Sequence, residues 1–143
     1  MIASPQNYLG LDVGGRRIGV AVAGIVARLS SPLLTLDRQD AGDIFERIEK
    51  LIDEHQVADV VIGLPRGMDG QETGQTAIAR EFADELTRTC GVVVHMQDEA
   101  ATSIAAEEEL KASGKPYQKG DIDSGAAAII LSDWLASNQK DGE

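Results

Sequence analysis

The sequence predicts an α/β domain in which a five-stranded mixed sheet carries helices on both faces. Three short apolar runs come first in the chain, each of a length typical of a strand. Two further apolar runs then alternate with segments of helical periodicity, a pattern that favours parallel strands joined by right-handed crossovers. We therefore expect the element order β-β-β-α-β-α-β-α-α.

The first three strands are expected to form a meander. Residues 8–13 and 18–23 flank a turn that contains two glycines and two arginines, which predicts a hairpin. Residues 29–36 form a weaker run that contains Pro32. Because proline has no N–H for the ladder, this third strand should lie at a sheet edge or contain a bulge.

Helices and strands alternate in the rest of the chain. In residues 43–55 apolar side chains recur at i, i+4, i+7 and i+8, and Asp43 with Glu46 resembles a capping box. Residues 59–63 and 92–97 are almost entirely apolar, so we expect two strands buried on both faces. Periodicity and composition place further helices at residues 76–89, 102–112 and 122–137, with loops at 64–75 and 113–120.

Length and composition favour one domain of ordinary type. The 143 residues can bury a substantial core, and we expect a single domain over residues 1–143 with frayed ends at about 1–6 and 138–143. A single cysteine permits no disulfide within the chain, and the cysteine and two histidines lack zinc-motif spacing. No stretch is long and apolar enough for a membrane span, and the first residues lack the pattern of a signal peptide, so we expect a cytoplasmic protein without membrane contact.

Asp12 is the first candidate functional residue. It lies at the end of an otherwise apolar strand, where an unpaired carboxylate is costly and needs a metal, an arginine or backbone N–H groups as partner. The glycines that follow allow a ligand or another backbone to approach closely. The structural alternative is that Asp12 accepts hydrogen bonds from the turn at residues 14–17.

Other carboxylates are expected near Asp12. Asp98 and Glu99 follow a predicted parallel strand, and Asp123 lies at the start of the last helix. Ligands of open α/β sheets bind outside the carboxyl ends of parallel strands, where these acids would converge. Carboxylates brought together in this way favour one or two Mg²⁺ or Mn²⁺ ions, which can promote phosphodiester hydrolysis. Taken singly, Asp98 and Asp123 are equally explained as helix N-caps.

Four blocks of sequence resemble the YqgF/RuvX family over nearly the whole chain. They are LDVGGRRIGVAV, VVIGLPRGMDGQETGQT with AREFADEL, the DEAAT segment and IDSGAAAIIL, of which the GLPxxMDG loop is the most specific. The resemblance implies an RNase H-like fold and a metal-dependent nuclease of the kind that processes the 5′ end of pre-16S rRNA. It implies that Asp12, Glu99 and Asp123 are catalytic and bind the metal, with Asp98 as the alternate for Glu99.

The sequence departs from the family pattern mainly at basic positions. Ala100 replaces an arginine, and Gly15 stands where the family has Thr or Ser. The helix after the GLPxxMDG loop is often basic in the family, yet several of its positions are here Ala77, Ile78, Glu81 and Glu85. The net charge of −11 agrees with this loss and counts against easy nucleic-acid binding.

Residues that would contact substrate are therefore few. We expect Arg16, Arg17, Arg80 and Thr102 to do so, the first two because they lie beside Asp12 on the hairpin. The expected partner is structured RNA, with branched DNA as the near alternative. A basic or ribosomal protein could supply positive charge, and we expect a monomer or weak homodimer.

Three other functions stay open at this point. The same fold could cleave four-way DNA junctions, as a Holliday junction resolvase does. Alternatively, the loss of basic residues could mark a non-catalytic binding module with a degenerate RNase H-like fold. The LDVGG hairpin also resembles the phosphate-binding hairpin of the sugar kinase/Hsp70/actin family, although those proteins close two such lobes over a nucleotide.

Overall fold

The computed structural model describes residues 4–99 and 102–138 and confirms the predicted element order. The expected frayed ends lie largely outside the described residues. None of the described helices is long and apolar enough to cross a bilayer. The elements are β1 (Asn7–Val13), β2 (Arg17–Gly24), β3 (Ser30–Asp37), α1 (Ile44–Glu54), β4 (Val57–Pro65), α2 (Gly74–Cys90), β5 (Val93–Glu99), α3 (Thr102–Ser113) and α4 (Lys119–Ser137).

The five strands form one mixed sheet in the order β3-β2-β1-β4-β5. β2 is antiparallel to both of its neighbours, whereas β1, β4 and β5 are mutually parallel. The hairpin of β1 and β2 is confirmed, and β3 lies at the edge as its proline predicted. The register between β2 and β3 also shifts where Ala21 pairs with Pro32, so the strand has both the edge position and the irregularity expected.

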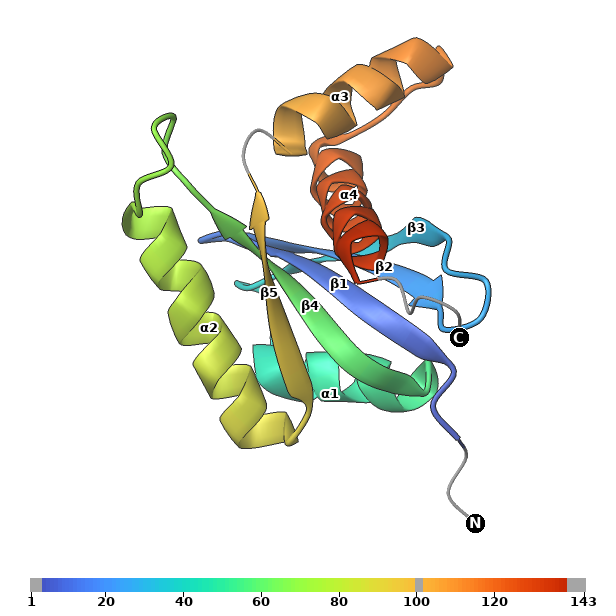
Figure 1. The fold of residues 1–143 in the computed structure, drawn as a ribbon, viewed down its shortest axis with the longest axis vertical. Coiled ribbons are helices and arrows are strands. Elements are labelled where there is room, and N and C mark those ends of the chain that lie inside the picture. Colours follow the sequence, from blue (N-terminus) through green and yellow to red (C-terminus); the bar gives the residue numbers. More distant parts are fainter. Residues whose placement is uncertain (1–3, 100–101, 139–143) are drawn as a thin grey trace.

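Helices cover both faces of the sheet (Figure 1). α1 and α2 pack on one face, α4 lies across the other, and α3 packs against α4. Side chains alternate along β1 because successive residues of a strand point to opposite faces. Leu9, Leu11 and Val13 enter the core beneath α1 and α2, whereas Tyr8 joins the core beneath α4. Asp12 therefore points to the α4 face.

Glycines let α4 approach the sheet closely. A Cβ added to Gly10 of β1 would lie 2.8 Å from Leu131 Cβ and 3.0 Å from the main-chain oxygen of Ala127. Added carbons at Gly19 of β2 and Gly63 of β4 would collide with α4 as well. The three glycines lie on three adjacent strands, so the helix rests on backbone and its own side chains are brought down to the sheet.

The structure corrects two predictions about elements. β5 was expected to be buried on both faces, but it is an edge strand, and Val93 is 57% exposed. The sequence of an edge strand can be as apolar as that of a central strand when a helix covers one of its faces. Here Val94 and Met96 of β5 pack against the core beneath α2. α4 begins at Lys119, three residues earlier than expected, because its polar first turn carries no apolar periodicity.

Two smaller predictions about α1 and β5 are also refined. Asp43 caps α1 by accepting a hydrogen bond from the Phe45 N–H, but among the described residues no return bond comes from Glu46. His95 was expected to be buried in β5. Its ring is instead half-exposed, with Nε2 lying 2.8 Å from Asp59 Oδ2 and the ring packed against Trp134.

Candidate metal centre

Asp12 and Asp123 come together where β1 ends and α4 begins. Asp12 is the sixth residue of β1 and points to the α4 face, while Asp123 lies in the second turn of α4. Burial, together with the nearby negative charge of Asp123, raises the pKa of Asp12 to about 6. Within the described residues, no hydrogen bond reaches the Asp12 carboxylate, so the turn at residues 14–17 is not its partner.

Arg17 is the cation nearest to this acidic pair. Its Nε donates to Asp123 Oδ2 over 2.5 Å, and its side chain remains 39% exposed. Asp123 was expected at the helix start, where it could have been an N-cap. The N-cap is Gln118, and Asp123 lies four residues inside the helix, free of a capping role. Arg17 therefore neutralises one acid of the pair and leaves Asp12 without a partner among the described side chains.

Glu99 is the last residue of β5 and follows His95 and Gln97 on alternate positions of that strand. Burial raises its pKa to about 8, and the neighbouring carboxylates of Asp133 and Asp98 contribute to the rise. Glu99 Oε1 is buried and, among the described residues, has no hydrogen-bond donor. A pKa of about 8 favours the protonated form of Glu99 at neutral pH.

The described residues contain no group of three or more Asp, Glu, His or Cys side chains close enough to hold a metal ion. The structure brings Asp12 of β1 and Asp123 of α4 together. Glu99 of β5 lies instead beside Asp133, which is further along α4. Even so, the donor chemistry fits a hard divalent cation. Carboxylate oxygens are ligands of the type that Mg²⁺ and Mn²⁺ prefer, and the buried Oε1 of Glu99 has no hydrogen-bond partner among the described residues.

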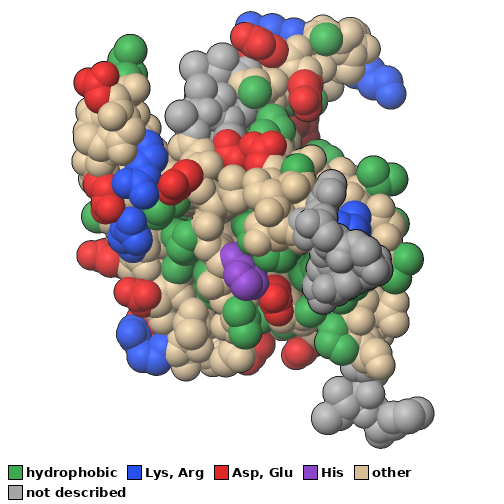
Figure 2. Space-filling view, viewed as in Figure 1, with side chains coloured by type: hydrophobic (Ala, Val, Ile, Leu, Met, Phe, Trp, Pro, Cys, Tyr) green, Lys and Arg blue, Asp and Glu red, His purple; other side chains and the backbone are tan. Residues whose placement is uncertain are grey.

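Acidic side chains surround this end of the sheet. In the space-filling view they gather between the end of β5 and α4, whereas Lys and Arg on the same face lie mainly over α2 and at the far end of α3 (Figure 2). The remaining arginines near the site are themselves paired with acids. Arg16 contacts Asp37 at 3.4 Å, and Arg66 contacts Asp98 at 3.2 Å.

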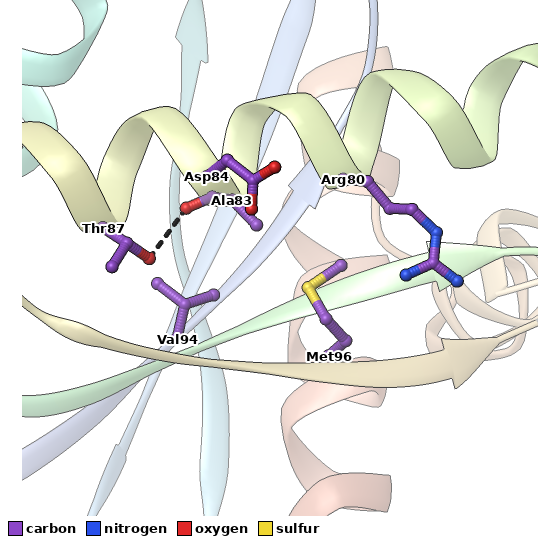
Figure 3. Close-up of a pocket in the computed structure, with 6 residues that line it drawn as sticks. All are labelled: Arg80, Ala83, Asp84, Thr87, Val94 and Met96. Atoms are coloured by element: carbon purple, nitrogen blue, oxygen red, sulfur yellow. Dashed lines mark hydrogen bonds between the residues drawn. The ribbon is translucent and has the colours of Figure 1, made fainter.

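Arg80 lies on α2, away from the acidic pair. Its guanidinium donates to Glu72 at 2.8 Å and reaches over β5 beside Met96, at a cavity of about 200 Å³ between the helix and the strand (Figure 3). Asp98 is a β5 residue whose side chain is 68% exposed, so it is not an N-cap. Thr102 begins α3, but its side chain lies outside the described part of the chain, as does Ala100.

Asp133 was not predicted as part of the site. It occupies the exposed side of α4, and its only signal in the sequence is a spacing of ten residues from Asp123, nearly three helical turns. That spacing leaves the two side chains roughly 80° apart around the helix axis, which is too weak a signal to link them. Without knowing that α4 crosses from β2 towards β5, nothing connects Asp133 with Glu99.

The sheet order and the acids beneath α4 define a class: this is an RNase H-like α/β domain with a carboxylate at the end of its first strand and another early in its last helix. Residues 6–137 match the family model described as "RuvX: Holliday junction resolvase". The chain belongs to this family.

Relatives of known name cover most of the chain. One from Chloroflexus aggregans, called "Putative pre-16S rRNA nuclease", is 43% identical over 132 residues, which are 91% of this chain and 93% of the relative. One of the same name from Shewanella denitrificans is 41% identical over 138 residues, 95% of this chain and 97% of the relative. The resemblance seen in the four sequence blocks is thus confirmed at the level of the family.

Two solved structures share the fold at low sequence identity. Thermus thermophilus RuvC in complex with a Holliday junction substrate has a TM-score of 0.54 and 16% identity, covering 92% of this chain and 95% of RuvC. Fowlpox virus resolvase with its Holliday junction DNA has a TM-score of 0.55 and 10% identity, covering 94% and 99%. These likenesses confirm the RNase H-like fold.

Proposed function

We propose that this protein is a divalent-metal-dependent nuclease that hydrolyses phosphodiester bonds of structured RNA, with the 5′ end of pre-16S rRNA as its substrate. The observation that carries the proposal is the placement of Asp12 beside Asp123 on the α4 face of the sheet. The names of the relatives supply the substrate class.

Asp12, Asp123 and Glu99 would hold Mg²⁺ or Mn²⁺, with Asp98 as the alternate for Glu99. When bound, one or two such ions supply an activated water and stabilise the leaving oxygen of the phosphodiester. Asp12 is largely ionised at neutral pH because its pKa is about 6, whereas Glu99 must first lose a proton to become a ligand. Arg17 holds Asp123 in place and is positioned to meet a phosphate.

Arg16, Arg80 and Thr102 are proposed to contact the substrate. Arg16 and Arg80 are each paired with an acid, so a phosphate would have to displace Asp37 or Glu72. A basic protein of the ribosomal precursor would compensate for the net charge of −11. We further propose that the domain acts as a monomer or weak homodimer.

The test is cleavage of an RNA that spans the mature 5′ end of 16S rRNA and its leader, with Mg²⁺ or Mn²⁺. The wild-type protein should cleave it, and Asp12→Asn and Asp123→Asn should lose more than the roughly 10–100-fold that loss of an outer-shell partner costs. Asp40→Asn, a change at an exposed turn residue, is the control. Undiminished cleavage by folded Asp12→Asn would refute the proposal.

Branched DNA is the second candidate substrate, and the description of the family model favours it. A four-way junction should therefore be assayed beside the RNA with the same variants. Cleavage of the junction alone would assign the activity to DNA. Cleavage of neither substrate, with or without added metal, would favour the non-catalytic binding module.

A further inference from the structure

A groove lies beside the acidic pair, between the α3–α4 turn and the first residue of β2. Its volume is about 630 Å³, within the range of pockets that hold small organic ligands. The residues that define its chemistry are Arg17, Glu107, Tyr117, Lys119, Ile122 and Asp123. Because Asp123 belongs to both, the groove opens directly onto the candidate metal centre.

Tyr117 provides an aromatic surface in this groove. It is half-buried, and its hydroxyl donates to Glu107 Oε2 over 3.0 Å, which ties the turn to α3. Ile122 adds an apolar side chain to the lining. An aromatic ring fixed at its polar end is suited to stacking with a nucleobase, an interaction that tolerates any base sequence.

The groove is lined by both cationic and anionic side chains. Arg17 and Lys119 lie on the elements nearest Asp123, and both side chains can meet a phosphate. Glu107 lies on α3 next to Tyr117, and its carboxylate only accepts hydrogen bonds. The Glu107 carboxylate beside Tyr117 suits the N–H groups on the edge of a base and repels a phosphate.

We propose that this groove binds one nucleotide of an unpaired strand, with its phosphate at Arg17 and Lys119 and its base stacked on Tyr117. The strand must be unpaired there, because a base in a duplex has no free face for the ring. The inference rests on the proposed nuclease function, since it places this nucleotide next to the phosphate to be cleaved.

The test measures stacking without cleavage, in the Asp12→Asn background and in EDTA. The probe is a hexanucleotide RNA with a single 2-aminopurine, whose fluorescence is quenched when the base stacks. Asp12→Asn should bind with quenching, and the added change Tyr117→Phe should preserve both because the ring remains. Adding Tyr117→Leu should abolish the quenching and weaken binding roughly tenfold.

Lys119, at the start of α4, and Lys115, in the preceding loop, allow a matched test of the phosphate contact. Both lysines are exposed, but Lys119 lines the groove and Lys115 does not. Lys119→Gln should weaken binding several-fold more than Lys115→Gln. Equal effects of the two changes, or unchanged quenching in Tyr117→Leu with an unchanged melting temperature, would overturn the inference.

Failure of this inference is distinguishable from failure of the nuclease function. If the protein cleaves RNA and Tyr117→Leu leaves KM and kcat unchanged, the groove assignment is wrong and the nuclease function stands. If no RNA or DNA is cleaved but quenching still depends on Tyr117, the groove assignment stands as a binding site and the nuclease function is wrong.

Discussion

The main-chain oxygen of Asp123 lies against the Cα of Gly19, with no room for a methyl group between them. Gly19 is also the residue that pairs with Asp12 across the β1–β2 ladder. The glycine thus occupies the position beside Asp12 and admits the turn of α4 that carries Asp123. The missing side chain of Gly19 therefore both allows α4 to pack closely on the sheet and brings Asp123 next to Asp12.

Gly19→Ala should damage both stability and activity. The added Cβ meets backbone instead of a side chain that could rotate, so α4 must shift, at a cost of about 3 kcal/mol in the free energy of unfolding. Gly15→Ala is the matched control, because a Cβ there meets nothing within 4 Å. Urea denaturation of both variants checks the prediction, which fails if the two are equally stable.

Asp12→Asn should make the protein more stable while removing its activity. The folded-state pKa of Asp12 is about 6, above the value of about 3.9 of an unfolded chain, so ionisation of Asp12 destabilises the fold. The folded state binds the extra proton between these pH values, and the stability of the wild type falls as the pH rises through them.

The gain from Asp12→Asn should therefore depend on pH. It should be close to zero below about pH 4 and reach about 2 kcal/mol above pH 7. Thermal melts of the wild type and the variant from pH 4 to 8 measure it. A gain that is largest at pH 4 would show that the burial of Asp12 is not the cause.

Arg17→Gln should tighten the binding of divalent cations. The guanidinium occupies Asp123 and competes with a metal for the same carboxylate, so its removal should raise the affinity roughly tenfold. Arg16→Gln, which breaks the exposed contact with Asp37, should change the affinity little. Calorimetric titration with Mn²⁺ compares the two, and a weaker affinity in Arg17→Gln would contradict the competition.

Asp133→Asn should shift the pH dependence of metal binding. Burial and the carboxylate of Asp133 raise the pKa of Glu99 to about 8, so neutralising Asp133 should lower the pH at which Glu99 becomes a ligand. NMR-detected Mg²⁺ titrations between pH 6 and 9 follow the midpoint. Asp69→Asn, in the exposed β4–α2 loop, should leave it where it is in the wild type.

Much of the fold could be predicted because it depends on local patterns. Pro32 predicted an edge and an irregularity, and the glycine turn predicted the hairpin. The approach of Asp12 to Asp123 could also be predicted from a strand end and a nearby helix start, although Asp123 lies one turn further into the helix than expected and Glu99 lies beside Asp133 instead. The edge position of β5 could not, because an apolar strand beside a helix has the same composition as a central one.

The contacts between charged side chains could not be predicted from the sequence. Arg17 and Asp123 are 106 residues apart, and their contact depends on how α4 crosses the sheet. The same crossing brings Asp133 to Glu99. Arg80 was expected to contact a substrate, yet its guanidinium pairs with Glu72, which lies in the loop before α2.

These ion pairs within the protein affect how strongly its affinity for nucleic acid would depend on salt concentration. Binding of nucleic acid by free lysines and arginines releases the ions condensed on the phosphates, and affinity falls steeply as the salt concentration rises. Here a phosphate that reaches Arg16, Arg17 or Arg80 exchanges places with a carboxylate, which itself attracts ions when it is set free. Cations released from the phosphate are then largely replaced by cations bound to the freed carboxylate, so little entropy is gained. Affinity should therefore depend only weakly on ionic strength. Such a protein would spend little time on arbitrary stretches of nucleic acid and would discriminate by shape.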